Sequence, residues 1–203
     1  MMIESGEDFV TMYIFLGDSG VTRPHGELIA FLPAVACDLG WEICTEADAE
    51  RRWRAGPAAR WVSLSDSALD AESLDLRATT SPLAQEISVR WPVAVVRRSA
   101  GVLTFLLYRD GDFVDHYANR ALPGEDTGGG DETPGRGGDP SRWADLLGTP
   151  RNAMRLETVW GSWSDADEVL SRTAAIVGWD MGSVLDAPGS STLALRQGSP
   201  KGL

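Results

Sequence analysis

The chain has 203 residues, a net charge of −12 and an isoelectric point of about 4.5. Hydrophobic residues make up 43% of it and charged residues 24%, which is typical of a soluble globular domain with its own core. The negative charge repels phosphate groups, which argues against binding to nucleic acids or to anionic membrane surfaces. It is compatible with plain solubility or with a basic protein partner.

The first elements along the chain are a predicted strand and a long amphipathic helix. Residues 12–16 form a short apolar run typical of a strand, and a start at Met12 would leave residues 1–11 as an extension. Apolar residues at helical spacing predict a helix over 26–39. Pro33 removes one backbone donor inside it, so we expect a kink there.

The middle of the chain changes from helical to strand-like patterning. We expect a short helix over 45–53, a strand over 59–66 and a helix over 82–90, the last capped by Ser81 before a proline. Three β-rich runs follow, and Asp110-Gly111 is the strongest hairpin signal in the chain. They predict an antiparallel meander of three strands over 92–99, 101–110 and 112–119, whose middle strand is apolar on both faces.

Proline and glycine signals organise the last third of the chain. They predict a helix over 140–147, a helix from Pro150 toward Val159, and a helix over 165–176 that Ser164 caps. The expected division is a main α+β domain over 1–121, a glycine- and acid-rich loop or linker over 122–138, a helical segment over 139–187 that packs on the same domain, and a frayed polar tail over 188–203.

Cysteine usage and composition bear on the cellular setting. Cys37 and Cys44 have a C-x6-C spacing, which matches neither a zinc site nor a redox pair, so two reduced thiols in the cytoplasm are expected. Lys201 is the single lysine, and this arginine bias with abundant alanine and glycine is typical of a high-GC bacterial genome. No metal or cofactor is predicted.

The sequence Gly-Asp-Ser-Gly at residues 17–20 follows the first predicted strand. Over Tyr13 to Gly20 the chain resembles the first block of the SGNH (GDSL-type) hydrolase family, which implies Ser19 as nucleophile. That family also has an Asp-x-x-His block and a Gly-x-Asn-Asp block, which this chain lacks; neither His25 nor His116 follows an aspartate at the required spacing. Because a serine needs a positioned base, we predict a structural turn and no catalytic residue. A contact between Ser19 and His25 would reverse this prediction.

The segment Asp-Phe-Val-Asp-His-Tyr at residues 112–117 holds two carboxylates and a histidine. Neighbouring strand residues point to opposite faces, and Asp112 lies roughly 13 Å from His116, so a metal site is not predicted. A two-residue turn would place His116 opposite Phe105 and Val114 opposite Leu107, on a core face. The other face would carry Leu106, Tyr108, Phe113, Asp115 and Tyr117. That face is either packed under a helix or, if uncovered, a binding surface.

Eight tryptophans border the predicted elements, and core packing explains most of them. Trp160 and Trp163 lie between two predicted helices and are candidates for a partly exposed pair. The candidate interface or ligand residues are therefore Tyr108, Phe113, Asp115, Tyr117, Trp160 and Trp163.

Two functions remain open from the sequence. The first is a non-catalytic protein-binding protein of the adaptor, antitoxin or immunity type, which the acidic charge and the missing catalytic set favour. The alternative is a small-molecule enzyme or ligand-binding domain with a Trp/Tyr-lined pocket and Asp115, Ser19 or His25 as polar groups. The expected fold is α+β, a mainly antiparallel sheet covered by helices.

Overall fold

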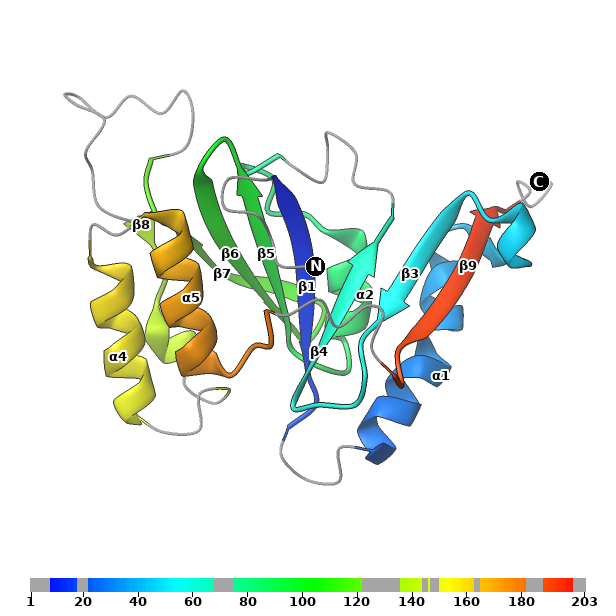
Figure 1. Cartoon of the computed structure of the whole chain (residues 1–203), viewed down its shortest axis with the longest axis horizontal. Coiled ribbons are helices and arrows are strands. Elements are labelled where there is room, and N and C mark those ends of the chain that lie inside the picture. The colour runs from blue at the N-terminus through cyan, green and yellow to red at the C-terminus, as the bar shows by residue number, and fades with distance from the viewer. Residues whose placement is uncertain are drawn as a thin grey trace.

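The computed structural model describes residues 8–17, 22–67, 75–121, 136–143, 146, 150–162, 165–181 and 188–198. Within this part of the chain the fold is α+β, as predicted. Its centre is a nine-stranded sheet, in the order β2-β9-β3-β4-β1-β5-β6-β7-β8, in which every neighbouring pair is antiparallel (Figure 1).

The strands are β1 Phe9–Phe15, β2 Trp41–Ile43, β3 Arg51–Ala55, β4 Trp61–Asp66, β5 Val93–Ser99, β6 Val102–Arg109, β7 Asp112–Ala118, β8 Arg136–Gly137 and β9 Ser191–Gln197. The α-helices are α1 Thr22–Asp38, α2 Pro82–Ser88, α4 Pro150–Trp160 and α5 Ala166–Val177, and the 3-10 helices are η1 Glu46–Asp48 and η2 Pro140–Trp143. None of these helices is both long enough and apolar enough to cross a membrane.

The predicted meander is confirmed in strands β5, β6 and β7. Asp110 and Gly111 both have positive φ, 55° and 83°, as the tight two-residue turn of a hairpin requires. Strand β6 is buried on both faces from Val102 to Tyr108, and β5 is buried from Val93 to Arg98. Both strands are therefore central, and each face of the sheet needs its own cover.

Helices cover the two faces at opposite ends of the sheet (Figure 1). One core packs α4, α5 and η2 against one face, where Phe105, Leu107 and Tyr117 meet Leu156 and Val169. The second core packs α1 and α2 against the other face, and its members include Ile14, Leu28, Val62, Ile87, Val95 and Leu106. The protein is thus a three-layer arrangement of helices, sheet and helices.

Three sequence predictions of local structure need correction. Residues 45–53 are not one helix: η1 spans three residues, and β3 begins at Arg51 because Trp53 and Ala55 alternate inward while Arg52 and Arg54 do not. Helix α5 is capped by Asp165, whose carboxylate accepts the amide of Glu168 at 2.8 Å. Of the helix expected over 140–147, Pro140–Trp143 form the 3-10 helix η2 and Leu146 is helical, and the other residues of that range lie outside the described chain. Strand β1 begins at Phe9, so residues 9–11 belong to the sheet.

The predicted frayed tail is wrong for residues 191–197. They form β9, which lies between β2 and β3 and pairs with both. Its sequence, Ser-Thr-Leu-Ala-Leu-Arg-Gln, has few apolar residues, and Leu195 and Ala194 are its buried ones. The strand is held by hydrogen bonds to its two neighbouring strands rather than by its own hydrophobicity. Its amino-acid composition therefore did not indicate a strand.

We predict that Gly138→Ala destabilises the protein by about 2 kcal/mol. Gly138 has φ +80°, and a β-carbon there would lie 2.7 Å from the Trp160 ring and 3.0 Å from the Tyr117 β-carbon. The matched control is Gly111→Ala, where φ is +83° but the nearest atom is Val89 Cγ2 at 3.4 Å. That variant should lose only about 1 kcal/mol, the backbone cost. Chemical denaturation of both measures the difference, and equal losses would contradict the packing explanation.

Candidate functional site

The predicted aromatic face is divided between the two sides of the sheet. A β-bulge shifts the β6–β7 register between Leu107 and Tyr108, so that Phe105 lies opposite Tyr117 and Leu106 lies opposite His116. The predicted pairing of His116 with Phe105 is therefore wrong. The bulge inserts one residue, which turns Asp115 and Tyr117 toward the α5 side of the sheet and leaves Tyr108 on the α2 side.

Most of the candidate interface residues lie in the core. Tyr108 is 0% exposed, Tyr117 1% and Trp160 3%, and the Tyr117 and Trp160 rings stack with centroids 4.6 Å apart. Phe113 is 37% exposed and contacts the Tyr108 ring edge-on. Trp163 lies outside the described residues. The exposed aromatic surface is thus not formed, because both faces of the meander are covered by helices.

Asp115 has a structural role in this arrangement. Its carboxylate is buried and accepts hydrogen bonds from the Trp143 indole and from the Asp139 backbone amide, both at 2.9 Å. These bonds attach η2 to β7 and satisfy a charge that burial would otherwise make costly. Asp115 therefore positions the cover of one sheet face.

The two histidines do not come together. His25, in α1, contacts the Gly56 carbonyl oxygen through Nε2 at 3.1 Å; since a carbonyl only accepts, Nε2 is the donor. His116 lies on β7 opposite Leu106, on the other side of that strand from Asp115. Ser19 lies outside the described residues, so the Gly-Asp-Ser-Gly turn carries no structural conclusion.

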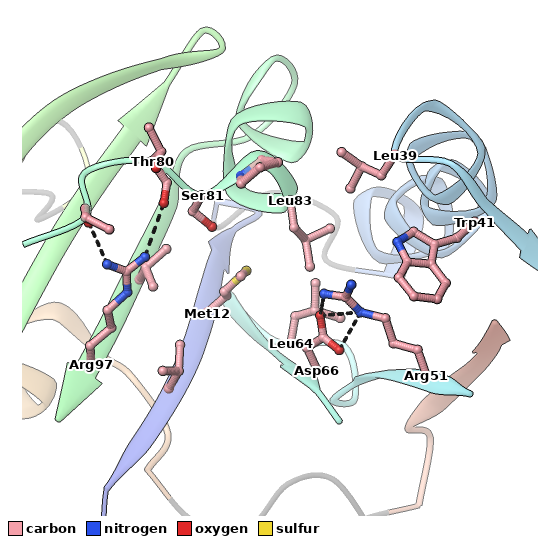
Figure 2. Close-up of a pocket in the computed structure, with 14 residues that line it drawn as sticks. Met12, Leu39, Trp41, Arg51, Leu64, Asp66, Thr80, Ser81, Leu83 and Arg97 are labelled. Atoms are coloured by element: carbon pink, nitrogen blue, oxygen red, sulfur yellow. Dashed lines mark hydrogen bonds and ion pairs between the residues drawn. The ribbon is translucent and has the colours of Figure 1, made fainter. Parts of the chain in front are cut away.

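A pocket of about 400 Å³ lies on the sheet face that α1 and α2 cover (Figure 2). It is bounded by the C-terminal end of α1, by β2 and by the N-terminal end of α2, with strands β1, β3, β4 and β5 as its floor. Its lining is Val10, Met12, Leu39, Trp41, Arg51, Leu64, Asp66, Ala78, Thr80, Ser81, Pro82, Leu83, Val95 and Arg97. This size and this mixture of apolar and polar groups are typical of small-molecule sites.

An ion pair forms one wall of the pocket. Arg51 donates from Nε to both oxygens of the Asp66 carboxylate at 2.9 Å and also from Nη2, and the two side chains are only 22% and 11% exposed. The Trp53 indole donates to the same carboxylate at 3.1 Å. The Arg51 guanidinium also lies over the Trp41 ring, 4.9 Å from its centroid. These contacts fix the guanidinium in one orientation.

The opposite wall contributes the hydroxyl of Ser81. Ser81 precedes α2 and is 7% exposed, but its side chain does not cap the helix. Figure 2 shows its hydroxyl oxygen directed into the pocket, on the side of Met12. Within the described chain, this hydroxyl makes no hydrogen bond. Because it opens into the pocket, this hydroxyl can exchange hydrogen bonds with water there or with a polar group of a ligand.

Arg97 supplies a second cation at the edge of the pocket. Its guanidinium, in a residue that is 3% exposed, donates to the carbonyl oxygens of Asp75 at 2.9 Å, Ala78 at 2.6 Å and Thr80 at 3.4 Å. Burial lowers the pKa of Arg97, and Tyr108 and Asp75 partly oppose that shift. These bonds hold the 75–80 segment, and with it Ser81, against the sheet.

A second pocket, of about 460 Å³, lies elsewhere on β3 and β4 and has a polar lining. It contains Arg52, which pairs with Glu46 at 2.5 Å, together with Arg54, Ser65 and Ser67. Because its lining has no apolar side chain, it offers no floor for the body of a ligand. The pocket between α1 and α2 is therefore the candidate site.

Sequence reasoning missed this site because its residues come from six separate segments. Ser81 was interpreted as a helix cap, and Arg51 and Asp66 were placed in a helix and at a strand end. One signal was available. In a strand, Arg51, Trp53 and Ala55 lie on the same face, so the Arg51 charge lies on an apolar surface and needs an oppositely charged partner. Recognising it required β3 to be identified as a strand.

Comparisons with protein-family models, with curated proteins and with solved structures find no match to this chain.

We predict that the protein shows no tyrosinate absorbance at pH values where free tyrosine ionises. All three tyrosines of the chain are buried. Burial raises the pKa of Tyr13, with a smaller contribution from Asp180, and of Tyr108, in each case to about 12, and burial also raises the pKa of Tyr117.

The sign of the stability effect follows from these raised values. Unfolded tyrosines lose their protons near pH 10 while the folded ones keep them, so the unfolded state binds fewer protons above that pH. Their contribution is complete below about pH 10 and is lost as the pH rises through the folded pKa values. Alkaline titration by ultraviolet absorbance, with circular dichroism in parallel, should show tyrosinate appearing together with unfolding. Tyrosinate formation near pH 10 in a folded sample would contradict the burial.

Proposed function

We propose that this protein binds a small molecule in the pocket between α1 and α2. The observation that carries the proposal is the hydroxyl of Ser81, which has no hydrogen-bond partner within the described chain and is directed into a cavity whose floor is apolar. An apolar cavity with a few fixed polar groups gives both affinity and orientation to a ligand. Burial of Tyr108, Tyr117 and Trp160 supports this function over an aromatic docking face.

The construction of the site supports binding to a preformed cavity. Arg51 is held by Asp66 and Trp41, and the segment before Ser81 is held by Arg97. Fixed side chains lose little conformational entropy when a ligand binds. A rigid site therefore binds a ligand more tightly than a flexible site that makes the same contacts. The polar groups therefore need no rearrangement to receive a ligand.

We expect ligand-observed NMR with neutral, anionic and cationic aromatic fragments to identify binders that compete for one saturable site. Met12→Trp places a large ring on the pocket floor and should abolish this binding. Met154→Trp is the matched control, because Met154 is 67% exposed on α4 and does not line the pocket.

Loss of binding in the first variant, with binding kept in the second, supports the proposal. Failure of every charge class to bind the wild-type protein, or unchanged binding in Met12→Trp, would overturn it. Circular dichroism of both variants verifies that the fold is retained.

The second candidate function is docking of a basic protein partner, as the net charge of −12 suggests. It is favoured by two exposed apolar side chains, Val89 at 59% and Phe113 at 37%. They border the same hairpin turn, because a β-carbon on Gly111 would lie 3.4 Å from Val89. Exposed apolar groups of this kind are common at protein interfaces.

This candidate predicts a stoichiometric basic protein that co-purifies with the chain. The double variant Val89→Asp/Phe113→Asp should release it, since charge on an apolar contact is costly to bury. Met154→Asp changes an apolar side chain on α4 that is 67% exposed, and it should leave the complex intact. Equal recovery of the partner with both variants would contradict docking at this turn.

A further inference from the structure

We infer that the ligand of the α1–α2 pocket is a small carboxylate with an apolar body; this inference rests on the proposed binding function. Three observations carry it: the free donor on Arg51, the charge of the lining, and the apolar floor between the two polar walls. Each of them restricts the chemistry of the occupant.

The Arg51 guanidinium has one nitrogen that no described residue uses. Its Nε and Nη2 atoms bind Asp66, while Nη1 makes no hydrogen bond with any side chain or carbonyl of the described chain. Figure 2 shows the end of the guanidinium turned away from Asp66 and toward Leu83. A guanidinium nitrogen can only donate, so the group that meets it must be an acceptor. A carboxylate makes the stronger, charge-assisted bond.

The charges that line the pocket do not cancel. Arg51, Arg97 and Asp66 are its ionised side chains, which leaves one positive charge in excess. The carbonyls that bind Arg97 are neutral, and the carboxylate of Asp75, which also acts on Arg97, is on an exposed residue. In a partly buried site an excess charge favours an opposite charge on the ligand. A ligand with one negative charge would neutralise the excess positive charge of the pocket, whereas a cationic ligand would add to it.

The remaining surface calls for an apolar body. Met12 and Leu64 lie between the Arg51 wall and the Ser81 wall, and Leu83 extends from α2 above them (Figure 2). Removing such surface from water is favourable in proportion to its area. The Ser81 hydroxyl, at the other wall, can donate to or accept from a second polar group of the ligand. A short fatty or aromatic acid has this distribution of groups.

The test compares three probes of one chain length by isothermal titration calorimetry. Octanoate, octanamide and octylammonium have nearly the same shape and differ in charge. We expect octanoate to bind roughly tenfold more tightly than octanamide, since a charge-assisted bond replaces a neutral one, and octylammonium to bind most weakly.

Two double variants identify the group responsible. Arg51→Met/Asp66→Asn removes both charges together and leaves an amide oxygen for the Trp53 indole, so no single charge remains buried. Because Arg97 keeps its charge, this variant removes only the Arg51 bond and should reduce the preference for octanoate over octanamide without reversing it. Arg52→Met/Glu46→Gln removes the neighbouring ion pair on β3, which does not line this pocket, and should keep the preference. Ser81→Ala should not weaken octanoate binding, because octanoate has no second polar group to meet that hydroxyl.

The outcomes separate the two proposals. Equal binding of octanoate and octanamide, or tighter binding of octylammonium, would overturn the carboxylate inference while fragment binding upholds the pocket. The inference is also overturned if none of the three probes binds. Failure of the fragments and of all three probes to bind would overturn the binding function itself.

Discussion

Burial of the central strands on both faces is the constraint on which the rest of the structure depends. No residue of β6 from Val102 to Tyr108 and none of β5 from Val93 to Arg98 faces water, so the sheet cannot exist without helices on each side. The chain satisfies this with α1 and α2 on one face and with α4 and α5 on the other. Polar residues within these strands must then be satisfied internally, as Arg98 is by Asp167 and Arg97 by three carbonyls.

The candidate site arises where one of these covers is incomplete. The pocket lies between the end of α1 and the start of α2, and its walls carry Arg51, Asp66 and Ser81. Core packing alone would fill such a space with apolar side chains, because buried polar groups reduce stability unless they are paired. The paired arginine and the hydroxyl that opens into the pocket are the groups on which the proposed binding function rests. Asp115 provides the contrast, since both of its bonds serve to hold η2.

The local charge of the pocket is opposite to that of the molecule. The chain carries −12, yet the pocket lining has one positive charge in excess. Long-range repulsion of an anion is screened over about 8 Å at physiological salt, whereas contacts inside a partly buried pocket are screened much less. For the proposed ligand, affinity would therefore depend on Arg51 and its neighbours, and the net charge would act mainly on the rate of association.

Local patterns in the sequence determined the α+β class, the meander and helices α1, α2, α4 and α5. These patterns are caps, turn residues and apolar spacing, which act over a few neighbouring residues. Non-local pairing decided the rest. β9 is stabilised by β2 and β3, and the bulge in β7 reversed the facing of Asp115 and Tyr117, which no local pattern specifies. The pocket also belongs to the tertiary structure: Arg51, Asp66 and Ser81 become neighbours only when β3, β4 and α2 are assembled on one sheet face.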